Sequence, residues 1–472
     1  MESDTKHCES DRYILNKESS EIPSILNPRN HSNRPQHQKM SHEEKNELQK
    51  RITTRGLSGL SNFGSTCYMN AALQSLSATK PFIAYMIHPK SEIMSHLEKR
   101  ILDDMYLKHH KENLEKEIEP EPELSVCIID IKKDAKKKLA YKLRSMMKKM
   151  WVRNCEIEPR QLKQCVDKNL KYFTGGSQQH DSQEFLTALL DNIHESTKAD
   201  GVYICKFDQE TATLDSEMKN MESALSDARK QKDIESIKMI TSQIDNLYIT
   251  NPSTFLKIRS IWAWIDILKS AYSVINDIFS GMSLTTITCF DCKKSTHKFE
   301  RNDLLTLHLP EKIEEDKTKY TLHELLTNYT ASELMTNANK YHCGYCGIKT
   351  DAIKKNTIYQ QPNVLVIMFK KYQQYNGSIL KTNIKIDYDH ILDIKDFVSD
   401  HVECNTKYEL YSVIRHSGGA SGGHYYTYSK NMINDLWYLF DDGNVYNVDD
   451  DEPLRCNGYV LFYRQIEMNL PI

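Results

Sequence analysis

The sequence lacks any apolar run near the length of a membrane span, and it lacks a strong excess of charge of either sign. Its 472 residues carry a formal net charge of −3 at pH 7. A spanning helix needs roughly twenty apolar residues in a row, and no run in the chain approaches that length. The near-neutral charge argues against a general nucleic-acid partner. We therefore expect a soluble protein with no membrane span and no dedicated nucleic-acid site.

The beginning of the chain lacks the apolar core of a secretory signal peptide. Residues 1–50 are polar with scattered prolines, and they contain too few apolar side chains to form a core. We expect a flexible polar arm over this range. We also expect an intracellular location, in the cytoplasm, the nucleus or both.

One cysteine, Cys67, lies between a turn of small residues that begins at Gly59 and a helical pattern. In the first turn of a helix, unpaired N–H groups and the helix dipole favour a thiolate, so we expect a pKa below roughly 8.5. Cys67 is therefore a candidate nucleophile, and a buried, inert cysteine is the alternative. The helix is predicted from apolar residues at spacings of three and four, namely Met69, Ala72, Leu73 and Leu76.

A histidine that follows a glycine-rich segment is the candidate general base. Gly422 and Gly423 immediately precede His424 and allow the backbone to approach the imidazole closely. The aromatic residues that follow predict a strand. We expect the two glycines to line a narrow substrate channel and Tyr425 to contact the substrate.

A second aromatic strand ends in two carboxylates, Asp441 and Asp442. We predict an antiparallel hairpin centred between residues 432 and 433, which places His424 directly opposite Asp441. Opposed residues have Cβ atoms about 5 Å apart, a spacing that suits a carboxylate holding an imidazole N–H. Asp441 is then the orienting acid, and a bulge in the hairpin would transfer this role to Asp442.

Cysteine, histidine and aspartate in this order match the cysteine-protease form of the catalytic triad. Acyl transfer also needs hydrogen-bond donors for the oxyanion. Asn62 precedes Cys67 on the same turn, and its amide can act together with the Cys67 backbone N–H. The alternative is that Asn62 only stabilises the turn.

A second helical pattern begins near Asp181, and Asp181 and Glu184 share one face of its first turn. The residues alone favour a capping box. In that arrangement Asp181 accepts a backbone hydrogen bond and Glu184 reaches back to the start of the helix.

Two Cys-x-x-Cys pairs lie about fifty residues apart, and each follows a strand-like run. Two such knuckles form a tetrahedral thiolate site, so we expect one structural zinc ion. Disulfide bonds are the alternative, but a catalytic thiol requires a reducing compartment. The four expected ligands are Cys289, Cys292, Cys343 and Cys346.

Three further segments have recognisable patterns. Residues 363–369 form a nearly continuous apolar run, which predicts a buried central strand. The charged stretch of about 109–150 ends in a basic, amphipathic segment that we interpret as a surface helix rather than a lipid or nucleic-acid site. Residues 206–250 show a short coiled-coil pattern with a break at 230–233, and this insertion either packs on the protein itself or binds a protein partner.

Together these motifs resemble the ubiquitin-specific protease family of ubiquitin carboxyl-terminal hydrolases. The resemblance rests on a cysteine box at 59–76, an acidic box at 178–186, a histidine box at 408–448 and a closing strand at 458–464. It implies an α+β, papain-like cysteine protease fold over about 56–465. The expected parts are a helical thumb (about 56–200), zinc-knuckle fingers (about 280–360) and a β-rich palm (about 275–290 and 360–465).

The resemblance implies a deubiquitinating thiol protease that cleaves the peptide or isopeptide bond after the terminal Gly-Gly of ubiquitin. Its partners would be ubiquitin and ubiquitinated proteins, and the family's fingers commonly hold zinc. A catalytically silent ubiquitin-binding scaffold and a protease for another ubiquitin-like modifier are the alternatives. The implied roles are a triad at Cys67, His424 and Asp441, oxyanion assistance by Asn62, and binding of the ubiquitin tail's arginines by Asp181 and Glu184.

Overall fold

The computed structural model describes residues 54–88, 97, 134–135, 137–174, 178–198, 207–269, 271–310, 317–375, 378–382, 384–402, 404–419 and 422–466. The polar arm expected at 1–50 and most of the charged stretch expected at 109–150 lie outside this range. No described helix has the length and apolarity that crossing a membrane requires.

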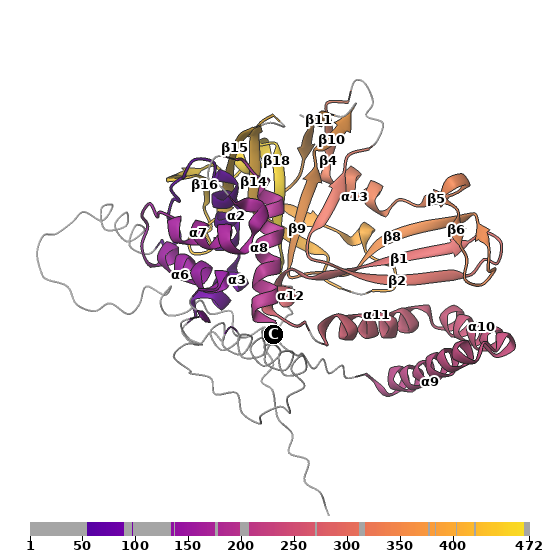
Figure 1. Cartoon of the computed structure of the whole chain (residues 1–472). Helices are drawn as coiled ribbons and strands as arrows, with labels where there is room; N and C mark the ends of the chain where they lie inside the picture. The colour runs from indigo at the N-terminus through magenta and orange to yellow at the C-terminus, as the bar shows by residue number, and fades with distance from the viewer. Residues whose placement is uncertain are drawn as a thin grey trace, which may run out of the picture.

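A helical lobe contains the predicted cysteine helix at its centre (Figure 1). Every residue of that helix is buried, because it packs between other helices and the main sheet. The basic helix α6 buries its apolar stripe in the same lobe and leaves Lys149 exposed, as the surface-helix prediction requires. The lobe consists of α2 (Cys67–Ser77), α3 (Lys80–Ile87), α6 (Leu139–Val152), α7 (Arg160–Asn169), η2 (Lys171–Phe173) and α8 (Ser182–Thr197).

The main sheet has eight strands and packs against this lobe (Figure 1). Only the β3–β9 pair is parallel among its described pairings. The apolar run predicted as a central strand is β9, which is buried except for its last residue. The strand order is β17 (Asn444–Val448), β16 (Trp437–Asp441), β15 (Gly423–Lys430), β14 (Lys407–Gly418), β18 (Gly458–Gln465), β9 (Val364–Lys370) and β3 (Leu305–His308), with β13 (Ile391–Asp393) also paired to β14.

A second, four-stranded antiparallel sheet extends away from the main sheet (Figure 1). Its strand order is β2 (Ser295–Asn302), β1 (Gly281–Cys289), β8 (Ala352–Gln360) and β5 (Glu333–Met335). The remaining elements are α12 (Val274–Phe279), α13 (Leu322–Thr330), η3 (Asn337–Asn339), η4 (Lys395–Phe397), α14 (Glu452–Arg455) and the strand pairs β4 (Lys319–Thr321) with β12 (Lys385–Asp387), β6 (Tyr341–His342) with β7 (Lys349–Thr350), and β10 (Tyr372–Tyr375) with β11 (Ser378–Lys381).

The predicted coiled-coil segment is a helical hairpin followed by a third helix beside the extended sheet (Figure 1). The helices are α9 (Gln209–Gln231), α10 (Ile234–Thr250) and α11 (Pro252–Leu268). The break falls where it was predicted, because Lys232 adopts a left-handed conformation and Asp233 caps α10. The apolar stripes of α9 and α10 face each other and α11, so this surface is covered by the chain itself.

The cysteine loop is joined to the C-terminal hairpin through a close backbone contact at Gly59. The Leu60 N–H donates to the Asp442 carbonyl at 2.7 Å, and the Ile157 N–H donates to the Gly59 carbonyl at 2.9 Å. A Cβ atom on Gly59 would lie 2.0 Å from the carbonyl oxygen of Gly443. Only glycine therefore fits at this junction.

Replacing Gly59 by alanine is expected to lower the free energy of unfolding by about 1–3 kcal/mol, because the methyl group overpacks a backbone contact. Urea denaturation followed by tryptophan fluorescence measures this change. Gly419→Ala is the matched control, since a Cβ there meets no described atom within 4 Å. Identical unfolding midpoints for Gly59→Ala and the wild type would show that the junction is not tight.

Candidate active site and metal centre

Cys67 is the first residue of α2, as predicted, but the residue is only 2% exposed. Burial raises the pKa of the Cys67 thiol, and the nearby carboxylate of Asp442 also raises it. The backbone N–H groups of Tyr425, Tyr68 and Cys67 itself offset only part of this effect. The predicted lowering of the pKa is therefore wrong for this structure, because the cost of desolvating a thiolate outweighs the helix N-terminus.

His424 and Asp441 form a hydrogen-bonded pair at the adjacent ends of β15 and β16. The His424 Nε2 atom lies 2.6 Å from the Asp441 Oδ1 atom, and since a carboxylate only accepts, the imidazole N–H donates. The Nδ1 atom is then the ring nitrogen left to act on a thiol. No hydrogen bond joins Cys67 to His424, although both belong to the described part of the chain.

The hairpin that carries this pair has a register different from the predicted one. Thr427 pairs with Phe440, whereas the predicted centre would have paired it with Tyr438. The turn is centred one residue later than predicted, between residues 433 and 434, where the Asn431 N–H donates to the Leu436 carbonyl and Asp435 adopts a left-handed conformation. The prediction that His424 directly opposes Asp441 is thus wrong. A shift of two residues keeps the same face, so the two side chains still meet diagonally.

Asp442 links the cysteine loop and the cysteine helix to this hairpin. Its Oδ2 atom accepts from Asn62 Nδ2 and its Oδ1 atom accepts from Asn70 Nδ2, both at 2.8 Å. His424 Nε2 is farther away, at 3.9 Å from Asp442 Oδ2. Asp441 therefore has the closer contact to the imidazole. The sequence interpretation missed Asn70, a polar residue in a helix in which every residue is buried.

Asn62 makes both kinds of contact that the sequence left open. Its Oδ1 atom accepts from the Thr66 backbone N–H at 3.0 Å and from the Thr66 hydroxyl at 3.1 Å, which stabilises the turn. Its amide group has two N–H donors, and Asp442 takes one of them. Within the described chain, the second N–H has no acceptor recorded, so an oxyanion can use it.

Asp181 caps helix α8 as predicted, accepting from the backbone N–H of Gln183 at 2.7 Å. The predicted reach of Glu184 back to the cap is not formed, and Glu184 instead faces Tyr172. Asp181 also accepts from the Tyr459 hydroxyl at 2.5 Å. Burial raises the pKa of Asp181, and burial followed by the charge of Asp181 raises that of Glu184.

The glycine pair before His424 is held by a side chain that the sequence interpretation did not single out. Gln179 accepts from the Gly423 N–H at 2.6 Å, and its own amide donates to the Gly423 carbonyl. A Cβ atom on Gly423 would lie 2.3 Å from the Ser417 carbonyl oxygen. A Cβ atom on Gly422 would lie 3.3 Å from Gln179 Oε1. Glycine is therefore required at position 423 for the β14–β15 hairpin to close. In the same pair of strands, the Tyr425 ring stacks on His416.

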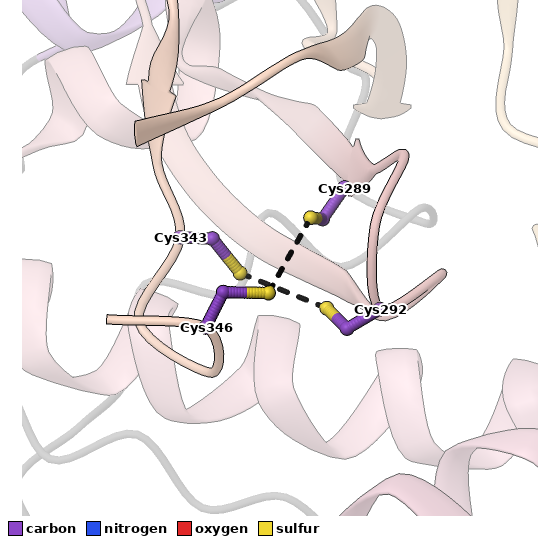
Figure 2. Close-up of side chains that lie close together, drawn as sticks. All are labelled: Cys289, Cys292, Cys343 and Cys346. Carbon is purple, nitrogen blue, oxygen red and sulfur yellow. Dashed lines mark hydrogen bonds between the residues drawn. The ribbon is translucent and has the colours of Figure 1, made fainter. Parts of the chain in front are cut away.

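The four predicted metal ligands converge at the far end of the extended sheet (Figure 2). All four thiols are free, with Sγ atoms 3.9 Å apart for Cys289 and Cys346, and 3.7 Å apart for Cys292 and Cys343. A tetrahedral zinc site with Zn–S bonds of about 2.3 Å has S–S edges of about 3.8 Å. The donor set and its spacing therefore fit a zinc ion.

The helical insertion contacts residues next to the four-cysteine cluster. Tyr345, which lies between two of the cysteines, donates its hydroxyl to Asp245 of α10 at 3.0 Å. Lys294 lies 2.6 Å from the same carboxylate and 4.6 Å from the centre of the Tyr345 ring. One carboxylate of the insertion thus holds both knuckles.

In the substrate-free protein, the alkylation rate of Cys67 by iodoacetamide is expected to keep rising above a pH of about 8.5. The reason is that a raised pKa moves thiolate formation to higher pH, and only the thiolate reacts. Mass spectrometry of the Cys67 peptide measures the rate, and the exposed Cys404 in the same digest controls for the reagent. A rate that is already constant between about pH 6 and 8 would contradict the raised pKa.

Comparison with solved structures shows the fold. A yeast SAGA deubiquitinase module, described with Ubp8, Sgf11, Sus1 and Sgf73 and bound to ubiquitin aldehyde, matches with a TM-score of 0.54 and 21% identity. The match covers 88% of this chain and 71% of that one. A second structure of the module, bound to monoubiquitin, has a TM-score of 0.56. The chain thus has the α+β fold with helical thumb, β-rich palm and fingers that the sequence predicted.

Sequence comparison identifies the family. The chain is 28% identical to the probable ubiquitin carboxyl-terminal hydrolase R319 of Acanthamoeba polyphaga mimivirus, over 87% of this chain and 90% of that protein. It is 24% identical to the human ubiquitin carboxyl-terminal hydrolase 2, of which it spans 55%. The model of the ubiquitin carboxyl-terminal hydrolase family matches residues 58–463. The chain therefore belongs to the ubiquitin carboxyl-terminal hydrolase family, a family of deubiquitinating cysteine proteases.

Proposed function

We propose that the protein hydrolyses the peptide or isopeptide bond that follows the C-terminal Gly-Gly of ubiquitin. The observation that carries this proposal is the placement of a helix N-terminal thiol, Cys67, against the two adjacent strands that contain His424 (β15) and Asp441 (β16). The names of the relatives and the ubiquitin bound to the similar structures support the same substrate.

In the proposed mechanism, His424 takes the Cys67 proton through Nδ1, and Asp441 stabilises the resulting imidazolium. The thiolate attacks the carbonyl carbon of the terminal glycine, and Asn62 with the Cys67 backbone N–H stabilises the oxyanion. His424 then protonates the leaving amine as the C–N bond breaks and a thioester remains. Water, deprotonated by His424, hydrolyses the thioester and releases the thiol.

The substrate-free geometry supports activation on binding. The thiol has a raised pKa and no hydrogen bond to His424, so proton transfer requires the ring to move toward the sulfur. The Gly-Gly tail would occupy the space beside Gly422 and Gly423, with Tyr425 near it, and the arginines of the tail would face Asp181 and Glu184. Of these two, Glu184 is the more exposed carboxylate.

The four cysteines of the fingers would hold one structural zinc ion. Such an ion fixes the knuckles in place and takes no part in the chemistry, because all four coordination positions are filled by protein thiolates. Ubiquitin and ubiquitinated proteins are the proposed partners. A further protein partner at the helical insertion stays a prediction. Such a partner would have three exposed apolar side chains of α10 to contact, namely Ile234, Met239 and Ile249.

Labelling by ubiquitin that carries a thiol-reactive group at its C-terminus tests the proposed function. The wild type is expected to form a covalent adduct, and Cys67→Ala is expected to form none. Cys165→Ala is a matched control, because Cys165 is also a buried helix cysteine, in α7. Probes built on other ubiquitin-like modifiers should label more weakly.

Two outcomes would replace the proposal by an alternative. Binding of ubiquitin without any adduct would identify a catalytically silent scaffold. Labelling by another modifier in preference to ubiquitin would identify a protease for that modifier. Loss of labelling in Cys165→Ala together with Cys67→Ala would indicate misfolding, which circular dichroism of both variants distinguishes.

Purified protein is expected to contain about one zinc ion per chain, measured by inductively coupled plasma mass spectrometry. Cys343→Ser should lose the metal and unfold at lower temperature, because metal binding to a folded site contributes to folding. Cys404→Ser, at an exposed cysteine outside the cluster, should keep both. Protein without metal, in which all four cysteines resist a thiol reagent until reduced, would favour disulfide bonds instead.

A further inference from the structure

A cavity of about 190 Å³ lies behind the closed end of the β14–β15 hairpin, outside the catalytic cluster. Three of its lining side chains are basic and none is acidic. Within the described chain, none of the three basic groups lies within ion-pair distance of a carboxylate. The lining residues are Lys371, Lys381, Arg415, His416, Ser417, Gly418, Asn457 and Tyr459.

Neutral groups hold these cations in place. Lys371 is 2% exposed and donates to the Gly458 carbonyl at 2.8 Å and to the side-chain oxygen of Asn457. Lys381 donates to the carbonyls of His416 and Gly418, both at 3.0 Å, and its Nζ atom lies 2.8 Å from His416 Nδ1. The Arg415 guanidinium lies over the Tyr426 ring, 5.5 Å from its centre. The positive charges are therefore oriented but not neutralised by their contacts.

The protonation of the cluster reflects this crowding of like charges. Burial, followed by the charge of Lys381, lowers the pKa of Lys371 to about 7. Burial and then the charge of Arg415 lower the pKa of Lys381, and only the more distant Asp181 raises it. An anion in the cavity would favour the charged form of both lysines.

We propose that this cavity is a binding site for a phosphate-type oxyanion. One water molecule needs about 10–15 Å³ of such space, so the volume accommodates a tetrahedral anion with some water. The Arg415 guanidinium has no hydrogen bond within the described chain, so its fork of N–H donors can bind phosphate oxygens through strong charge-assisted hydrogen bonds, while the two lysines add positive charge. The basic tail of the proposed substrate does not suit a site of this charge.

Occupancy of the site would act on the adjacent catalytic hairpin. Ser417 pairs with His424, and Gly418 pairs with Gly423, so the cavity and the catalytic histidine share one pair of strands. Neutralising the three cations would reduce their repulsion of an arginine-containing tail. Bound phosphate is therefore expected to lower the KM for a ubiquitin substrate, an expectation that rests on the proposed function.

Thermal unfolding of the full chain tests the binding site without reference to activity. Inorganic phosphate at about 10 mM is expected to raise the Tm by about 2 °C or more over sodium chloride of equal ionic strength. Arg415→Met and Lys381→Met should abolish most of the shift. Lys298→Met is the matched control, since it removes an exposed charge on β2 and should retain the shift.

No phosphate-specific shift in the wild type, or an equal shift in all three variants, would overturn the proposal. A short phosphoserine peptide, tested beside inorganic phosphate, distinguishes the source of the phosphoryl group. A larger shift with inorganic phosphate assigns the site to a free anion, and a larger shift with the peptide assigns it to a phosphorylated side chain. A Tm shift without a change in KM would support the proposed binding site and contradict its proposed effect on the catalytic hairpin.

Discussion

The active site depends on the hydrogen bonds that Asp442 makes to two asparagines. Asn62 and Asn70 are separated from Asp442 by 380 and 372 residues, yet both amides meet its carboxylate. The proposed nucleophile lies on a helix of the helical lobe, while its proposed base and orienting acid lie on the main sheet. The Asp442 carboxylate, with the glycine contact beside it, helps to set the distance between them. The proposed triad is thus a property of the interface between the lobe and the sheet.

The same interface raises the pKa of the Cys67 thiol. It buries the Cys67 thiol against the sheet, and the nearest carboxylate adds to the effect of burial. A helix N-terminus alone would give a thiolate, but desolvation dominates when no cation lies within hydrogen-bond reach. A raised pKa keeps the thiol protonated over a wider pH range and makes it less readily oxidised. The proposed activation on binding would then also protect the cysteine between encounters with substrate.

The sequence correctly predicted those features that depend on residues close to one another along the chain. The start of the cysteine helix, the β9 strand, the break between α9 and α10, and the convergence of four cysteines all follow from spacing or capping. The predicted hairpin register was wrong, because the turn is centred one residue later, where Asp435 adopts a left-handed conformation that its residue type does not specify. The predicted lowering of the Cys67 pKa was wrong, because the sequence around Cys67 does not show that a strand far along the chain buries it. Asn70 was missed because its acceptor is remote.

The contact of α10 with the knuckles has a mechanical consequence. Asp245 touches Tyr345 from one knuckle and Lys294 beside the other, and Tyr248 of the same helix packs on His297 of β2. The helical hairpin is therefore braced against both the four-cysteine cluster and the extended sheet. A displacement of the hairpin would be passed first to the fingers, because these are the parts of the molecule that it touches.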